Sequence, residues 1–284
     1  MGPAGAVVFI DGAHAPDPRV SIFDRGFLFG DSVFEALRTY RGEPFALEEH
    51  IERLQRSMAL LSIPLAFSAE ALHGEVREAV RIAREDGGEC YVRIMVTRGV
   101  GPLHLDPRPA IQPCRVVLAA KLLPFPPMLE TGVSMATVRA HRAADGTAAA
   151  ASKVSAYVGN LLALMEAQAR GAYEALLVTE DGAVLEGHSS SFFVVRKGRV
   201  QTPPRAMGIL PGITRALIEQ VAAELDIPFV ERLLNPSDVY GADEAFLTSS
   251  LREVVPVIDV DGVRIPLGPV TAALREGYRQ RVSR

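Results

Sequence analysis

Lysine is scarce in this chain of 284 residues. Of its 30 basic residues only three are lysine, Lys121, Lys153 and Lys197, and the rest are arginine. A lysine amine can lose its proton and form a Schiff base with a carbonyl, which a guanidinium group cannot do. Lys197 precedes a glycine in a predicted hairpin turn and Lys121 closes a predicted strand, so both suit ordinary surface positions. Lys153, in the stretch ASKVSAYVGNLL, has no such role and is the candidate for chemistry.

Other features are scarce as well. The net charge is −4, so no basic face for nucleic acid or an anionic membrane is expected. The two cysteines, Cys90 and Cys114, lie in strand-like runs and show neither a disulfide framework nor the spacing of metal ligands. No apolar run is long enough to cross a bilayer, and the first residues do not resemble a secretion signal. We therefore expect a cytoplasmic globular protein that uses no metal.

The pattern of apolar residues predicts a mixed α and β protein with two domains. A small N-terminal domain is expected at 1–120, a proline-rich connector at 121–130 and a larger domain at 131–284. In the first, strands flank helices predicted over 47–61 and 68–87. In the second, the Lys153 segment is expected to run into a helix, and strand pairs turn at Asp181-Gly182 and Lys197-Gly198. A further helix follows LPGITR, and an amphipathic helix ends the chain.

If Lys153 forms its Schiff base with pyridoxal 5′-phosphate (PLP), the sequence should also contain the groups that bind this cofactor. These are a carboxylate at the pyridine nitrogen, a donor at the phenolate and a cradle for the phosphate. Glu186 ends a predicted strand, and the adjacent Gly187 leaves room for a ring; the alternative is a surface glutamate. Tyr157 lies four residues after Lys153 and would share its side of a helix; the alternative is a core aromatic.

The phosphate cradle has several candidates. In GILPGITRALIEQ a helix is predicted to begin at Ile213 and Thr214, where free amides and the helix dipole favour an anion. Ser249 and Ser250 follow a predicted strand and can donate to a phosphate oxygen, and Arg53 can supply a bidentate guanidinium. Each signal also fits an ordinary helix start or surface group. No glycine-rich loop of the Walker or dinucleotide type is present, so the anion need not be a nucleotide.

Taken together, these segments resemble the class IV, fold type IV, PLP-dependent aminotransferases. That family includes branched-chain aminotransferases, D-amino-acid aminotransferases and aminodeoxychorismate lyases. The resemblance covers nearly the whole chain and rests on the order and spacing of DRGFLFGDSVFEALR at 24–38, HIERL at 50–54, YVR at 91–93, Lys153 with Tyr157, EGHSSSFF at 186–193, LPGITR at 210–215 and ADEAFLTSSLREVVPV at 242–257.

The resemblance implies a cofactor between a small and a larger domain, and a homodimer in which a partner loop closes each site. It also implies that Lys153 forms the Schiff base and then acts as general base. The other roles would be Glu186 at the pyridine nitrogen, Tyr157 at the phenolate, and Arg53, the Ile213 and Thr214 amides, Ser250 and its neighbour Ser249 at the phosphate.

For the substrate, YVR and GVGPLHLDP resemble branched-chain aminotransferases. Tyr91 and Arg93 would lie near substrate carboxylates, and Phe29 and Phe34 would line an apolar pocket with Gly187 and Leu251. Three positions depart from the branched-chain pattern: Phe29 replaces a usual tyrosine, Ser191 a common asparagine and Leu251 a usual small residue.

The predicted function is amino-group exchange between an L-amino acid, branched-chain, hydrophobic or glutamate, and a 2-oxo acid. One alternative is a 4-amino-4-deoxychorismate lyase that releases pyruvate and 4-aminobenzoate, which the Ser250-Leu251 pair resembles. A D-amino-acid aminotransferase is the second alternative, but Leu103-His104-Leu105 stands where that group carries an Arg-x-His carboxylate trap. A protein that binds PLP without turnover, as a carrier or regulatory subunit, is a further alternative. The presence of Lys153, Tyr157 and Glu186 together argues against it.

Overall fold

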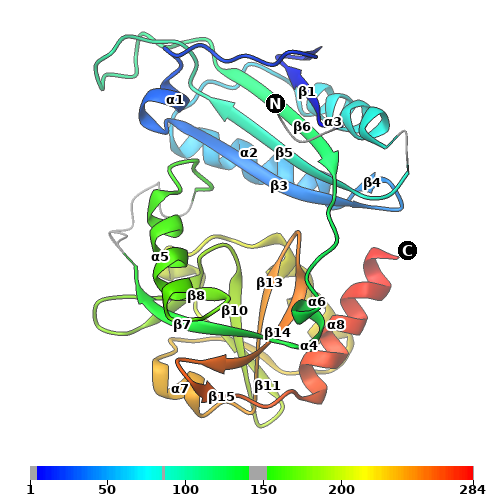
Figure 1. Cartoon of the computed structure of the whole chain (residues 1–284), viewed down its shortest axis with the longest axis vertical. Helices are drawn as coiled ribbons and strands as arrows, with labels where there is room; N and C mark the ends of the chain where they lie inside the picture. Colours follow the sequence, from blue (N-terminus) through cyan, green and yellow to red (C-terminus); the bar gives the residue numbers. More distant parts are fainter. Residues whose placement is uncertain (1–4, 85–86, 141–151, 284) are drawn as a thin grey trace. The chain divides into compact units, whose positions relative to one another are not determined.

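The computed structural model describes residues 5–84, 87–140 and 152–283. Their contacts group them into two compact units (Figure 1). Unit 1 takes in the described residues of Met1–Leu123 together with Ser152–Ala156. Unit 2 takes in those of Pro124–Ala151 and Tyr157–Arg284. The short segment that holds Lys153 therefore belongs to unit 1, although it lies beyond the connector in the sequence.

Unit 1 is built on a six-stranded antiparallel sheet with the order β2-β1-β6-β5-β3-β4. Its strands are β1 (Val7–Ile10), β2 (Ala13–His14), β3 (Ser32–Tyr40), β4 (Glu43–Pro44), β5 (Cys90–Thr97) and β6 (Cys114–Lys121). A short helix, α1 (Arg25–Phe29), precedes β3. The alternating burial of β5 follows from a sheet with one face in the core and one face less buried.

Helices α2 (Leu47–Leu60) and α3 (Ala69–Ala83) pack on this sheet (Figure 1). The predicted apolar stripe of α2 is confirmed, because Ile51, Leu54 and Met58 are buried in the unit 1 core. Ser68 caps α3 as expected, by accepting a hydrogen bond from the Ala71 N–H. That helix ends at Ala83, four residues before the predicted end at Gly87.

Unit 2 is built on a mixed sheet with the order β12-β11-β10-β13-β14-β7-β8-β9, with β15 paired to β14. Its strands are β7 (Val133–Arg139), β8 (Glu174–Val178), β9 (Val184–Gly187), β10 (Ser191–Arg196), β11 (Arg199–Thr202), β12 (Phe229–Glu231), β13 (Glu244–Ser249), β14 (Glu253–Val260) and β15 (Val263–Arg264). The pairs β14–β7, β7–β8 and β11–β12 are parallel, and the other pairs are antiparallel.

Helices cover this second sheet. α5 packs against β7 and β8, and α6 and α8 pack against each other and against β13 (Figure 1). The helical segments are α4 (Met128–Thr131), α5 (Val158–Ala169), the 3-10 turn η1 (Arg205–Met207), α6 (Ile213–Glu224), α7 (Pro236–Tyr240) and α8 (Pro269–Val282). None of the helices in the described ranges has the length and apolar character needed to cross a bilayer.

The expected mixed α and β architecture is confirmed, and the domain bounds 1–120, 121–130 and 131–284 stay a prediction. The turns at Asp181-Gly182 and Lys197-Gly198 join antiparallel strands as predicted. One premise is wrong: Lys153 and Tyr157 do not share a helix, because α5 begins only at Val158. The loop expected at 141–150 lies outside the described residues.

Candidate functional site

Lys153 is held in unit 1 as a short extended segment beside β3. Its carbonyl accepts the Phe34 N–H at 2.9 Å, and its own N–H donates to Ser57 Oγ at 3.3 Å. An isolated antiparallel bridge joins Val154 to Val33. The main chain of the lysine is therefore fixed on both sides, while its side-chain amine lies 4.6 Å from the centre of the Phe34 ring.

Phe34 also contacts Arg93, whose guanidinium carbon lies 4.0 Å from the centre of the same ring. The β3–β5 register puts Phe34 opposite Met95, and Ala36 opposite Arg93, so both side chains project from one face of the sheet. Tyr91, two residues before Arg93, shares that face. The structure thus brings the predicted substrate residues Phe34, Arg93 and Tyr91 to the same face, and Phe34 to Lys153.

A buried charged cluster occupies the opposite face of β3. The Glu35 carboxylate accepts hydrogen bonds from Arg53 Nε at 2.8 Å and Nη2 at 2.7 Å, and His50 Nδ1 lies 2.7 Å away. All three residues are at most 4% exposed. Arg53, predicted to bind phosphate, thus forms a bidentate pair that fixes its guanidinium. Whether it also holds a phosphate stays a prediction.

The electrostatics of this cluster follow from burial and pairing. Burial alone would raise the pKa of Glu35, but the charge and hydrogen bonds of Arg53, with those of His50, lower it to about 2. For His50, burial and the nearby charges of Arg53 and Lys153 lower the pKa against the opposing influence of Glu35. The sequence offered one signal for this cluster, a glutamate inside the apolar strand VFEAL, and the prediction missed it.

Glu35→Gln is expected to lower the free energy of unfolding at pH 7 by about 3 kcal/mol, because it leaves the buried Arg53 without its counter-charge. The pKa of Glu35 is lower in the folded state than its ordinary 4.5, so its stabilisation is present above that pH and is lost as the pH falls toward 2. Thermal unfolding at pH 7 and pH 4 should therefore show a smaller pH dependence in the variant. An unchanged melting temperature at pH 7 would contradict this account.

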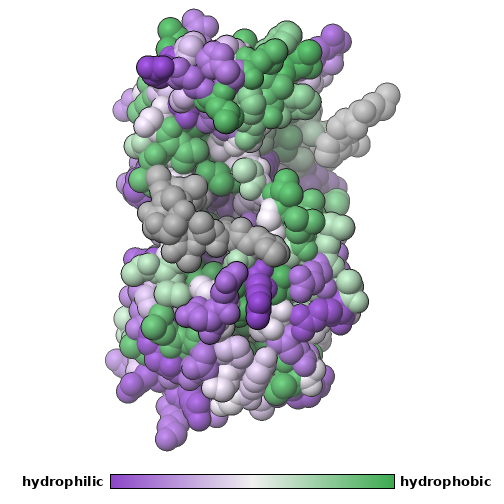
Figure 2. Space-filling model, turned by 90° about the vertical axis from the view of Figure 1, so that its left-hand side faces the viewer, coloured by the Kyte–Doolittle hydropathy of each residue, from purple (hydrophilic) through white to green (hydrophobic). Residues whose placement is uncertain are grey.

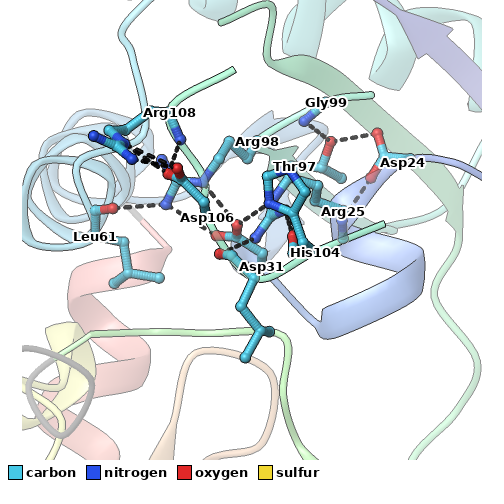
Figure 3. A network of polar contacts seen from close by, with 12 residues as sticks. Asp24, Arg25, Asp31, Leu61, Thr97, Arg98, Gly99, His104, Asp106 and Arg108 are labelled. Carbon is cyan, nitrogen blue, oxygen red and sulfur yellow. Dashed lines mark hydrogen bonds and ion pairs between the residues drawn. The ribbon is translucent and has the colours of Figure 1, made fainter. Parts of the chain in front are cut away.

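Unit 1 contains a second polar network, drawn in Figure 3. Asp31 accepts hydrogen bonds from Arg25 Nε at 3.0 Å and from Arg98 at 2.7 and 3.0 Å. Partial burial would raise the pKa of Asp31, but its bonds to Arg98 and Arg25 lower it. Arg25 also donates to the carbonyls of His104 at 2.8 Å and Leu105 at 3.0 Å. Two buried arginines and one carboxylate thereby hold the loop that follows β5.

Phe29, predicted to line the substrate pocket, lies at the end of α1 and is 38% exposed. The Arg25 guanidinium carbon is 4.8 Å from the centre of its ring. Phe29 therefore belongs to the network that holds the loop after β5, whereas Phe34 belongs to the Lys153 segment. Its role toward substrate stays a prediction.

In unit 2 the acid predicted for the pyridine nitrogen is buried. Glu186 lies in β9 and is 6% exposed, and one of its carboxylate oxygens accepts the Leu210 N–H at 3.2 Å. Glu186 is thus no surface residue, which excludes the ordinary alternative. A Cβ on Gly187 would lie 2.1 Å from Ser190 Oγ and 2.3 Å from Glu174 Oε1, so the glycine permits close internal packing. The space at the Cβ position of Gly187 is therefore already filled by Ser190 and Glu174. A cofactor ring would have to approach this glycine from another side, so the prediction that Gly187 leaves room for a ring stays a prediction.

Two other predicted parts of unit 2 have the expected form. α6 begins at Ile213, and no described side chain caps its first turn, so its amides are suited to an anion. Thr214, the next residue, is buried. Ser249 ends β13, and its hydroxyl accepts hydrogen bonds from the N–H of Arg252 at 3.1 Å and from Arg252 Nε at 3.3 Å. Ser250 and Leu251 form the turn that follows.

Each unit, taken by itself, holds groups of the kinds that bind PLP. Unit 1 supplies an amine on a fixed segment, and unit 2 supplies a buried carboxylate, a helix start without a side-chain cap and hairpin hydroxyls. A pyridinium, an aldehyde and a phosphate require these groups. Tyr157, the predicted phenolate donor, lies in unit 2 directly before α5.

Comparisons with known proteins agree with this chemistry. The family model described as amino-transferase class IV matches residues 32–260. A putative branched-chain-amino-acid aminotransferase of Methanocaldococcus jannaschii is 39% identical over 93% of this chain and 91% of its own length. A D-alanine aminotransferase of Staphylococcus haemolyticus is 34% identical over 96% of both chains. The structure of a T.th. branched-chain amino acid aminotransferase complexed with N-(5'-phosphopyridoxyl)-L-glutamate is 32% identical, with a TM-score of 0.90 over 98% of this chain and 94% of that one.

These likenesses extend over nearly the whole chain. They confirm the predicted fold type IV architecture. The chain belongs to the class IV aminotransferases and is an enzyme whose cofactor is pyridoxal 5′-phosphate.

Proposed function

We propose that this aminotransferase exchanges an amino group between an L-amino acid, branched-chain, other hydrophobic or glutamate, and a 2-oxo acid. The observation that carries the proposal is the pair of cations on the Phe34 ring, the Lys153 amine and the Arg93 guanidinium. No residue in the described ranges forms an ion pair with Arg93. A half-buried guanidinium that contacts the same ring as the reactive amine is suited to a substrate carboxylate, and the aromatic ring to an apolar side chain.

The remaining residues have the following proposed roles. When bound, PLP supplies the electron sink that makes the substrate α-proton removable. Lys153 moves that proton as general base, and the buried Glu186 carboxylate hydrogen-bonds the pyridine nitrogen. Tyr157 donates to the phenolate, and the start of α6 binds the phosphate together with Ser250. These assignments rest on the family resemblance and on the position of each residue within its own unit.

Transfer from D-amino acids is the second candidate. It is favoured by the 34% identity to D-alanine aminotransferases over 96% of this chain. The loop after β5 argues against it, because Leu103-His104-Leu105 offers no arginine and presents two carbonyls to Arg25. The lyase alternative rests on the Ser250-Leu251 pair in the β13–β14 turn.

Single-turnover measurements with the purified holoenzyme test the proposal. L-leucine, L-glutamate, D-alanine and 4-amino-4-deoxychorismate are added separately without a 2-oxo acid, and the visible absorption of the cofactor is followed. We expect the two L-amino acids to react at least about tenfold faster than D-alanine. Faster reaction of D-alanine supports the second candidate, and release of pyruvate with 4-aminobenzoate identifies a lyase.

Arg93→Met is expected to raise the KM for amino acid and 2-oxo acid by about 10- to 100-fold, because a charged hydrogen bond to the carboxylate is lost. The cofactor absorption should stay unchanged. Arg56→Met, at an exposed position on α2, is the matched control and should leave both KM values unchanged. An Arg93 variant with the KM values of the wild type contradicts the carboxylate role.

We also propose that the protein is a homodimer. Large hydrophobic residues are exposed along two segments of unit 1, 20–29 and 100–111, and hydrophobic surface is visible over this unit in Figure 2. The most exposed among them are Ile22, Phe27, Leu103, Leu105 and Ile111. Such surface is typical of a protein interface. Light scattering that reports a single-chain mass at assay concentrations would contradict this proposal.

A further inference from the structure

The turn between β13 and β14 is short and strained. Ser249 pairs with Glu253 across the hairpin, so Ser250, Leu251 and Arg252 make up the whole connection. Glu253, the first residue of β14, has a φ of 63°, a left-handed conformation that residues other than glycine rarely adopt. The turn carries the proposed phosphate ligand Ser250 and the proposed substrate contact Leu251, so its conformation bears directly on the site.

Arg252 turns back from this connection and contacts three other parts of unit 2. Its main-chain N–H and its Nε donate to Ser249 Oγ. Its Nη2 donates to Ser189 Oγ at 3.0 Å and to the Ser189 carbonyl at 3.4 Å. Its Nη1 pairs with the Glu174 carboxylate, at the first residue of β8. In the sheet, β7 lies between β14 and β8, so the side chain joins segments that are not strand neighbours.

Glu174 is the acidic partner of Arg252 in this ion pair. It is fully buried, and its Oε1 accepts the Ser190 hydroxyl at 2.5 Å, while His188 Nδ1 lies 3.2 Å away. Burial would raise the pKa of Glu174, but Arg252 and His188 lower it to about 2, so the carboxylate is ionised at neutral pH. Its Oε1 lies 2.3 Å from the place where a Gly187 Cβ would be. The carboxylate therefore packs against the main chain next to Glu186.

Resting on the proposed function, we propose that the Arg252–Glu174 pair positions two cofactor-binding segments of unit 2, the Ser250–Arg252 turn and the main chain at Glu186–Gly187. Neither residue is assigned a contact with the cofactor; both act through Ser250 and Glu186. A buried ion pair is often no more stabilising than a hydrophobic pair of similar volume. In this protein the role of the Arg252–Glu174 pair is to fix the conformation of a strained turn.

The test separates positioning from stability. The double variant E174M/R252M removes both charges and is expected to melt within about 5 °C of the wild type. Titration of the apoenzyme with PLP, followed by the visible absorption of the cofactor, should show a dissociation constant at least about tenfold higher than that of the wild type. R252M alone is expected to melt lower, because it leaves the buried Glu174 without its arginine partner.

Two further variants complete the design. R252K keeps the charge but lacks the fork that reaches Ser189 and Ser249, so it should melt like the wild type and bind PLP several-fold more weakly. R252K tests the proposal by itself if the double variant does not fold. The control E75M/R115M removes a buried ion pair of unit 1, 2.7 Å long, that contacts none of the proposed site residues. It should leave PLP binding unchanged.

A double-mutant cycle with Ser250→Ala identifies the route of the effect. If the pair acts through Ser250, S250A should weaken PLP binding in the wild type and much less in the E174M/R252M background. Wild-type PLP affinity in both E174M/R252M and R252K would overturn the inference, and effects that simply multiply would overturn its route through Ser250. A wild-type protein that takes up no PLP overturns the proposed function as well. Weak binding by S250A alone, with both pair variants unaffected, overturns only the role of the pair.

Discussion

Lys153→Met is expected to abolish transamination, with a fall in kcat/KM of at least about 10⁴-fold. Methionine has a similar length but no amine, so it can neither bond to the cofactor nor move the α-proton. The fold should persist, because the substitution keeps the main chain of this residue, which bonds to Phe34 and Ser57. The assay is amino transfer with L-glutamate as donor, with the cofactor absorption recorded on the same sample.

Lys197→Met is the matched control. Lys197 lies in the β10–β11 turn with a φ of 51°, where its main-chain N–H donates to Asp243 Oδ2. Its replacement should leave activity, absorption and melting temperature unchanged. An active Lys153 variant that keeps the cofactor absorption of the wild type would contradict the central assignment of this lysine.

Glu186→Ala is expected to lower kcat by about 10²- to 10³-fold, a typical effect of removing one preorganised electrostatic group from an active site. The 6% exposure of Glu186 means that water does not readily replace the lost carboxylate. In its proposed role, loss of this carboxylate would leave the pyridine nitrogen without an anionic partner and weaken the electron sink that PLP supplies. The Leu210 N–H also loses its acceptor, which costs about 1 kcal/mol of stability.

Rates with L-glutamate and L-leucine, together with PLP titration of the apoenzyme, measure this effect. Glu186→Asp keeps the charge and should recover part of the rate, which a purely structural role would not predict. Glu180→Ala, an exposed glutamate in the turn between β8 and β9, is the control. A Glu186→Ala enzyme within about threefold of the wild-type kcat would show that another group acts at the nitrogen.

Local patterns predicted most of the regular structure. The spacing of Ile51, Leu54 and Met58 predicted α2, and the Asp-Gly and Lys-Gly turns predicted the hairpins of unit 2, because these signals act over a few residues. The path of the Lys153 segment could not be read in this way. It depends on pairing with β3, more than 100 residues earlier in the chain, and such a contact leaves no local periodicity.

In the candidate site, too, residues with a local signal were predicted and contacts between distant residues were not. Glu186, the start of α6 and the Ser249–Ser250 pair lie at element ends, where a local argument has force. Clusters built from distant residues escaped prediction. His50 and Arg53 resemble ordinary surface residues of a helix, and only the packing of α2 on β3 makes them a buried cluster with Glu35. The Arg252–Glu174 pair joins residues 78 positions apart.

The most direct test of the central claim uses the scarcity of lysine. The purified holoenzyme is treated with borohydride, which makes the bond between cofactor and lysine permanent, and its peptides are then analysed by mass spectrometry. With only three lysines in the chain, the result is a choice among three positions. The account predicts a phosphopyridoxyl group on Lys153 and none on the other two. The group on Lys121 or Lys197, or on no lysine of a protein that had shown the cofactor absorption, would contradict it.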